Sequence, residues 1–237
     1  MFPPSNSSRA VIAGSLLVVG VVLAGAAQAH NVTGHDAAFI QSVRGPAVGP
    51  FLYLGAKHMV TGYDHLLFLV GVVFFLRRLR DIVKYVTLFT IGHSTTLLLG
   101  VFAGIRVDPF LIDAVIGFSV AVMAFCNLGG FKTLFGFEPD MRILVLVFGL
   151  FHGFGLATKV QEFNLAKDGL VTNILSFNVG IEMGQIIGLS LVLLALTAWR
   201  RSEGFARHAL VANTLLMTGG FLLTGYQMSG YFLATAT

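Results

Sequence analysis

A series of long apolar stretches is the feature that most constrains how this chain can fold. A helix that crosses a bilayer needs about 20 mostly apolar residues, and six stretches of that kind follow residue 50. They lie near residues 51–76, 85–104, 109–128, 142–159, 170–198 and 208–230. Only 11% of the 237 residues are charged, whereas soluble domains contain about 25%. The sequence predicts an all-α polytopic membrane protein, with residues 51–237 as a six-helix transmembrane bundle.

Residues 1–29 have the pattern of a cleavable secretory signal peptide. Arg9 precedes an apolar run, and residues 27–29 form the small-residue pattern A-x-A that is typical of a cleavage site. Cleavage would leave residues 30–50 as a periplasmic leader. That leader would offer three side chains for metal capture: His30, His35 and Asp36. Two alternatives stay open, namely an uncleaved first helix and a solvated leader without a metal-binding role.

The basic residues between the apolar stretches predict the orientation of the chain. Most of them follow the first, third and fifth stretches: Arg77, Arg78, Arg80, Lys84, Lys132, Arg142, Arg200, Arg201 and Arg207. Cytoplasmic loops are enriched in Lys and Arg. The pattern predicts a multi-pass protein of the bacterial inner membrane, with the mature N-terminus and the C-terminus in the periplasm. These loops also account for the net charge of +4, so no nucleic-acid partner is predicted.

Polar side chains within the apolar stretches mark a candidate site, because ionisable groups in a bilayer are costly and usually functional. They are His58, Asp64 and His65 in the first stretch, His93 in the second, Asp113 in the third, His152 in the fourth, and Asn178, Glu182 and Gln185 in the fifth. Counted from the predicted periplasmic ends at about 1.5 Å per residue, the histidines, Asn178 and Glu182 lie roughly 10–20 Å deep. Asp113 lies nearer the surface. The shared depth predicts that these side chains meet.

Ligand chemistry suggests what such a site would bind. Neutral imidazole and carboxylate are ligands of first-row metals, so five residues are predicted to hold a divalent Ni, Co or Zn ion: His58, His65, His93, His152 and Glu182. Four others are predicted to orient these ligands or relay protons: Asp64, Asp113, Asn178 and Gln185. On a continuous helix His58 and His65 share a face, whereas Asp64 projects about 100° away from His65. The alternative is that the histidines only join helices through hydrogen bonds, or form a proton path.

Four blocks resemble the signatures of the HupE/UreJ family of hydrogenase and urease accessory proteins. His58-x3-Gly62-x-Asp64-His65-Leu66-Leu67 is similar to the first-helix signature of the family, and FTIGHSTTL, GLFHGFG and NVGIEMGQ resemble its later signatures in the same order. The similarity covers roughly residues 50–228. It implies a small permease, with nickel or cobalt as the usual substrate. By this match the polar site residues are His58, Asp64, His65, His93, His152 and Glu182. Asp113 stands where a glutamate is expected in the family.

Three functions are compatible with these features. The first is a divalent-metal permease with an intramembrane His/Asp/Glu site open toward the periplasm. The second is a membrane-embedded metal-dependent hydrolase, in which Glu182 or Asp64 is the general base beside an open metal position. The third is a metal-delivery or assembly subunit that binds metal without net transport. The expected partners are the lipid bilayer, the metal ion, and hydrogenase or urease maturation machinery or other membrane subunits.

Overall fold

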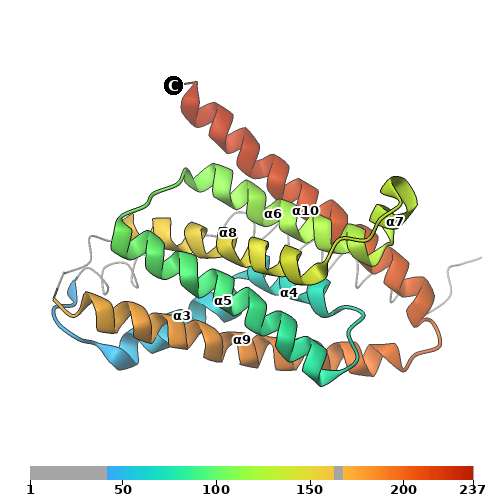
Figure 1. Ribbon diagram of the computed structural model, residues 1–237, viewed down its shortest axis with the longest axis horizontal. Coiled ribbons are helices and arrows are strands. Elements are labelled where there is room, and N and C mark those ends of the chain that lie inside the picture. Colours follow the sequence, from blue (N-terminus) through green and yellow to red (C-terminus); the bar gives the residue numbers. More distant parts are fainter. Residues whose placement is uncertain (1–41, 163–167, 237) are drawn as a thin grey trace, which may run out of the picture.

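The computed structural model describes residues 42–162 and 168–236. The predicted signal peptide and the predicted capture residues His30, His35 and Asp36 lie outside these ranges. The elements in the described ranges are all helices (Figure 1). They are α3 (Val48–Thr61), α4 (Tyr63–Val73), α5 (Leu79–Ala103), α6 (Pro109–Asn127), α7 (Gly130–Phe135), α8 (Met141–Glu162), α9 (Leu170–Arg200) and α10 (Phe205–Thr235).

Five of these helices are long and apolar enough to cross a membrane: α5, α6, α8, α9 and α10. The prediction of an all-helical membrane protein is therefore confirmed. The single helix expected over residues 51–76 is instead broken into α3 and α4. The apolar part of α4, Asp64–Val73, is too short to cross a bilayer alone. This region therefore needs both short helices to match the length of its neighbours.

The break between α3 and α4 lies at Gly62. Its backbone angles, φ −74° and ψ 88°, are not helical, although its N–H still donates to the carbonyl oxygen of His58 at 2.8 Å. A β-carbon here would lie 2.9 Å from that oxygen, 3.2 Å from Nδ1 of His65 and 3.3 Å from Oδ1 of Asp64. Any larger residue at position 62 would crowd the side chains of Asp64 and His65, so glycine allows the chain to turn here.

The two short helices run parallel to α9 along its whole length. At the start of α9, the side chain of Asn173 accepts a hydrogen bond from the N–H of Ala47 at 2.7 Å. At its end, Arg200 donates to the carbonyl oxygens of Val73 and Phe74, both at 2.6 Å. A helix of 31 residues is about 46 Å long at 1.5 Å per residue. The broken pair α3–α4 thus extends as far as an unbroken neighbour that can span a bilayer.

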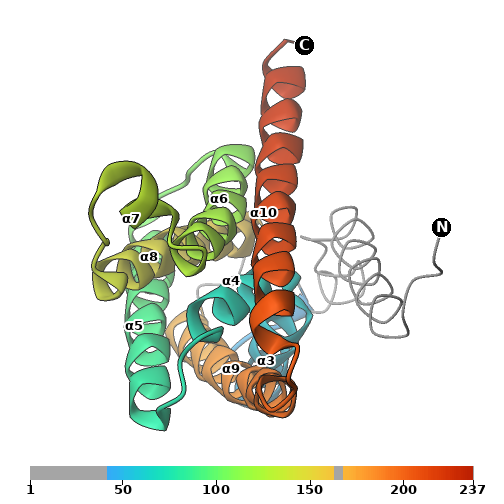
Figure 2. The same ribbon diagram turned by 90° about the vertical axis from the view of Figure 1, so that its right-hand side faces the viewer.

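The bundle consists of three closely packed helix pairs, α3 with α9, α5 with α8, and α6 with α10. Glycines make the close contacts: Gly55, Gly180 and Gly184 between α3 and α9, Gly92, Gly149 and Gly153 between α5 and α8, and Gly117 and Gly220 between α6 and α10. Such small residues let helix backbones approach in a membrane. Figure 2 shows α4 in the middle of the bundle, where it contacts α6 and α9. The start of α4 is therefore placed inside the protein.

Candidate intramembrane site

Three histidine rings, each from a different helix, gather around His65 of α4. Its ring centroid lies 5.4 Å from that of His58 on α3, 5.7 Å from His93 on α5 and 4.8 Å from His152 on α8. The side chains of His65, His93 and His152 are at most 3% exposed, and His58 is half-buried. The structure thus brings together four of the five residues predicted as metal ligands. We refer to these four side chains as the histidine cluster.

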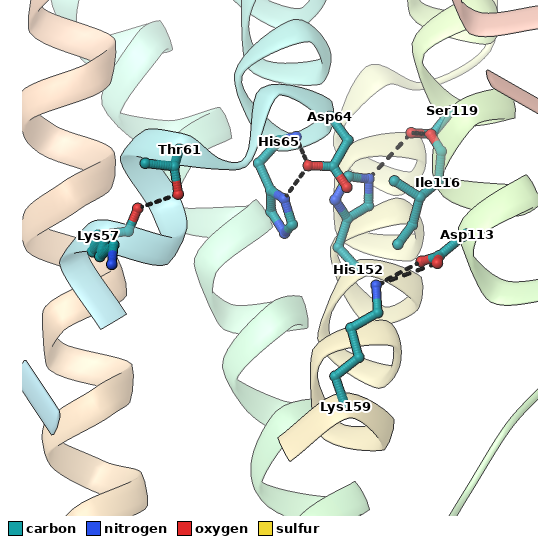
Figure 3. Close-up of polar contacts among 9 residues, drawn as sticks. All are labelled: Lys57, Thr61, Asp64, His65, Asp113, Ile116, Ser119, His152 and Lys159. Atoms are coloured by element: carbon teal, nitrogen blue, oxygen red, sulfur yellow. Dashed lines mark hydrogen bonds and ion pairs between the residues drawn. The ribbon is translucent and has the colours of Figure 1, made fainter. Parts of the chain in front are cut away.

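Asp64 holds the ring of its neighbour His65 (Figure 3). One carboxylate oxygen, Oδ1, accepts the backbone N–H of His65 at 2.9 Å and lies 2.9 Å from Nδ1 of the ring. The helical projection had placed Asp64 about 100° from His65. The contact forms because α4 begins here, and a side chain in the first turn can fold back onto a backbone N–H that has no helical partner. An ionised carboxylate only accepts hydrogen bonds, so Nδ1 carries the proton and Nε2 the lone pair.

Ser119 of α6 holds His152 in a second hydrogen bond (Figure 3). Its Oγ lies 3.2 Å from Nε2 of the ring and donates to the carbonyl oxygen of Ile116 at 2.6 Å. Both side chains are fully buried. Nothing in the sequence marks Ser119 as a site residue. A serine in a helix usually bonds its own backbone, so only its position opposite His152 distinguishes it.

Several ring nitrogens of the cluster have no hydrogen-bond partner among the described residues: Nε2 of His65, Nδ1 and Nε2 of His93, and Nδ1 of His152. Leaving a buried polar atom unpaired costs about 1–3 kcal/mol, and most such atoms in proteins are paired. Two imidazoles on one tetrahedral metal have ring centroids about 5 Å apart, since metal–nitrogen bonds are ~2.0–2.1 Å long. The observed separations from His65 are of this size. The donor set therefore fits a transition metal.

The cluster is not a closed metal site in this conformation. Across residues 42–162 and 168–236, no three His, Cys, Asp or Glu side chains are placed to hold one ion together. Glu182, the fifth predicted ligand, has an exposed side chain on α9. A bound ion would therefore require the rings to rotate or the helices to move closer.

Two of the predicted outer positions connect α9 to α5 beside the cluster. Ser94, the residue after His93, donates to Oδ1 of Asn178 at 3.0 Å. Thr90 donates to Oε1 of Gln185, also at 3.0 Å. Both amide side chains are buried. Asn178 and Gln185 thus fix α9 against the helix that carries His93.

Asp113 of α6 pairs with Lys159 of α8. The ammonium nitrogen lies 3.1 Å and 3.2 Å from the two carboxylate oxygens. Lys159 is seven residues beyond His152 on α8, which places it about 10 Å along the helix axis. Figure 3 shows this pair and the Ser119–His152 contact as two polar levels between α6 and α8. Lys159 lies in the last turn of α8, beside Asp113.

Phenylalanine rings close one side of the histidine cluster. On three helices a buried phenylalanine lies one turn from a histidine: Phe68 from His65, Phe89 from His93, and Phe148 from His152. The ring of Phe68 is 5.2 Å from Phe89, 5.9 Å from Phe148 and 5.1 Å from His152. We call Phe68, Phe89 and Phe148 the phenylalanine layer. It lies on the side of the cluster toward the end of α4, where the basic connections are.

Comparison with known proteins identifies a family that this chain matches. A family model described as HupE / UreJ protein matches residues 34–235. No curated protein and no solved structure matches. The family match covers all the helices of the described structure, including every residue of the histidine cluster.

Proposed function

Because this chain belongs to the HupE/UreJ family, we propose that it is a membrane permease for a divalent transition metal of the nickel or cobalt type. The metal is the transported substrate. The observation that carries the proposal is the histidine cluster, in which four imidazoles from separate helices meet inside a membrane bundle. Ionisable side chains at such positions usually mark the path of an ion or substrate.

In this proposal three buried nitrogens form the centre of the site: Nε2 of His65, Nδ1 of His152 and one nitrogen of His93. We propose these nitrogens as ligands because they are buried and have no hydrogen-bond partner in the described ranges. His58 is half-buried and lies on the predicted periplasmic side of His65, from which the metal would enter. Glu182 joins as a ligand only in another conformation, because its side chain faces outward here.

The proposed topology has six crossings, with α3 and α4 acting as two halves of one discontinuous span. Broken helices that expose their ends near the membrane midplane are a common device of transporters. Asp64 lies in the first turn of α4, where the helix dipole favours a negative side chain. The basic connections would lie in the cytoplasm, so that the metal enters from the periplasm and leaves across the phenylalanine layer.

The permease proposal is tested by metal flux into liposomes that contain the purified protein and an internal metal-sensitive dye. We expect saturable uptake of Ni²⁺ or Co²⁺ by the wild type and its loss in His65→Gln. The matched control is His208→Gln, which changes a histidine at the start of α10 and should keep the flux. Stable metal binding without any flux would contradict transport.

That outcome would support a second candidate, a metal-delivery subunit for hydrogenase or urease maturation. The observation that favours it is the phenylalanine layer, which stands between the histidine cluster and the predicted cytoplasmic side. A bound ion would then be handed to a partner after a conformational change rather than released by diffusion.

A further inference from the structure

We propose that Ser119 is a positioning residue of the metal site, because it determines which nitrogen of His152 is available to a metal. The inference rests on the proposed metal-binding function. Ser119 lies on α6, a helix that contributes no histidine to the cluster.

The Ser119 hydroxyl has a single hydrogen, which it can donate to one acceptor. Oγ of Ser119 lies 2.6 Å from the carbonyl oxygen of Ile116. A carbonyl oxygen cannot donate, so the hydroxyl hydrogen is used in this short bond. Oγ therefore presents a lone pair to Nε2 of His152, 3.2 Å away. Nε2 must carry the ring proton, and Nδ1 is left with the lone pair.

If His152 were protonated on Nδ1 instead, its contact with Ser119 would have no hydrogen to share, or the serine would have to give up its bond to Ile116. Nε2 would then be an acceptor and would need the hydroxyl hydrogen. The 2.6 Å distance to Ile116 against 3.2 Å to His152 shows which acceptor the hydrogen follows, since hydroxyl bonds are usually about 2.7–2.8 Å long. The geometry thus fixes the ring in the form protonated on Nε2.

The free nitrogen of His152 is turned toward the rest of the cluster. Figure 3 shows the two ring nitrogens on opposite sides, one toward Ser119 and the other toward His65. The rings of His65 and His152 are 4.8 Å apart, and Nδ1 of His152 has no partner among the described residues. Phe68 and Phe89 pack against the same ring at 5.1 Å and 5.2 Å. The ring is therefore anchored on one edge and packed on its sides, which leaves Nδ1 as its ligating atom.

Ser119 and Asp64 perform the same task for two different rings. Each accepts a hydrogen bond from the N–H of one ring nitrogen so that the other nitrogen can bind a metal, a relation that often accompanies histidine ligands. His65 is held through Nδ1 by a carboxylate and offers Nε2. His152 is held through Nε2 by a neutral hydroxyl and offers Nδ1. The serine orients its ligand without adding charge to the site.

The tautomer is measured in metal-free protein, so this test does not depend on metal binding. Solid-state NMR of protein labelled with ¹⁵N-histidine separates protonated from unprotonated ring nitrogens, and the signals absent from His152→Gln identify His152. We expect a protonated Nε2 and an unprotonated Nδ1 in the wild type. A wild-type ring protonated on Nδ1 would overturn the proposal.

The effect on the metal is measured as the affinity for Ni²⁺ in detergent. We expect Ser119→Ala to weaken binding about 10–100-fold, as is typical when the partner of a ligating histidine is lost, and Ser119→Thr to recover part of it because the hydroxyl is kept. The control is Ser176→Ala. Ser176 is also buried and donates to a carbonyl of its own helix, that of Thr172, and we expect this change to leave the affinity within about twofold.

Equal losses in Ser119→Ala and Ser176→Ala would show a general packing effect and contradict the positioning role. So would an unchanged affinity in Ser119→Ala. If the wild type bound no Ni²⁺ while His152 had the expected tautomer, the proposed function would fail together with the ligating role of Nδ1. The hydrogen-bond assignment would still hold, so the two failures are distinguishable.

Discussion

Asp64 is the residue whose role the structure defines most narrowly. One of its oxygens accepts both the backbone N–H and the ring Nδ1 of His65, each at 2.9 Å. The contact requires an acceptor at that position, and an amide can supply one only through its carbonyl oxygen. Asp64→Asn therefore removes the charge with little change in volume, which separates the effect of the charge from that of packing.

Asp64→Asn should weaken the affinity for Ni²⁺ about 10–100-fold, because the partner of a ligating histidine loses its charge. Titration calorimetry of purified protein in detergent measures this loss. The thermal midpoint should fall much less, since the side chain keeps its shape. Asp113→Asn is the informative comparison, because that carboxylate pairs with Lys159 rather than with a histidine. An equal loss in both variants would mean that net charge, and not the contact with His65, governs affinity.

At the residue scale the sequence indicated that the histidines would meet, but not which neighbours they would contact. His58, His65, His93 and His152 stood out because polar groups in lipid are rare and costly. Ser119 did not, because a serine that bonds its own helix is ordinary in a membrane. The phenylalanine layer could not be predicted from the sequence. The chain has 22 phenylalanines, and the packing of rings from three helices depends on tertiary structure. The same dependence explains Asp64, which contacts His65 only because a helix starts there.

Helices α5 and α8 pack closely enough that their glycines control where two of the histidines lie. A β-carbon on Gly153 would overlap the carbonyl oxygen of His93 and the hydroxyl of Thr96. Gly153 follows His152 directly, so this contact brings the backbones at His152 and His93 close together. The hydroxyl of Thr96 adds a hydrogen bond to the carbonyl oxygen of Leu150 at 2.6 Å.

Gly153→Ala should therefore destabilise the protein by about 1–3 kcal/mol, the usual result of overfilling a packed site, and should reduce metal binding. Gly225→Ala on α10 is the control, because no atom lies within 4 Å of its added β-carbon. Replacing such a glycine in a helix with alanine stabilises by up to about 1 kcal/mol. Thermal unfolding in detergent compares the two. Equal midpoints would contradict the close α5–α8 contact.

At the element scale the sequence predicted where the apolar stretches lie but not the break in the first one. The expected helix over residues 51–76 was plausible because glycine is frequent in membrane helices, and Gly62 alone does not signal an interruption. The break depends on contacts that only the fold supplies. These are the crowding of Asp64 and His65 against Gly62 and the bonds of Arg200 to the end of α4.

Over the whole molecule, the relative directions of the helices agree with alternating crossings. The pair α3–α4 is parallel to α9, and α5 is parallel to α8. Helix α6 is antiparallel to α10, as the contacts of Gly117 with Leu223 and of Gly220 with Ala121 require. Six crossings that begin with α3–α4 would give these relations. The basic residues then select one of the two possible orientations.

A reporter fused after Arg201 should be cytoplasmic, and one fused after the C-terminal Thr237 should be periplasmic. The physical reason is the excess of Lys and Arg in the connections at one end of the bundle. Alkaline phosphatase, which is active only in the periplasm, and a fluorescent protein that folds in the cytoplasm would report the two locations. The reverse pattern would overturn the orientation, and the same location for both fusions would overturn the final crossing.

A metal held by the histidine cluster would have to pass the phenylalanine layer to reach the side of the basic connections. A cation needs water or ligands on its path, and rings packed 5.2 Å and 5.9 Å from Phe68 provide neither. If separation of these rings limits transport, Phe68→Ala should raise the Ni²⁺ flux per folded protein several-fold, while binding at the histidines changes much less. The liposome assay measures the flux, and titration calorimetry in detergent measures the binding.

Loss of a buried ring costs about 3–5 kcal/mol, so the milder Phe68→Leu accompanies Phe68→Ala and should give a smaller rise in flux. The matched control is Phe51→Ala on α3, which removes another buried ring, 3% exposed, outside the layer. If packing alone were affected, Phe51→Ala and Phe68→Ala would change flux alike, and the layer would be part of the core rather than a barrier. A rise confined to the Phe68 variants would place the closed side of the pathway at these rings and would favour transport over delivery to a partner.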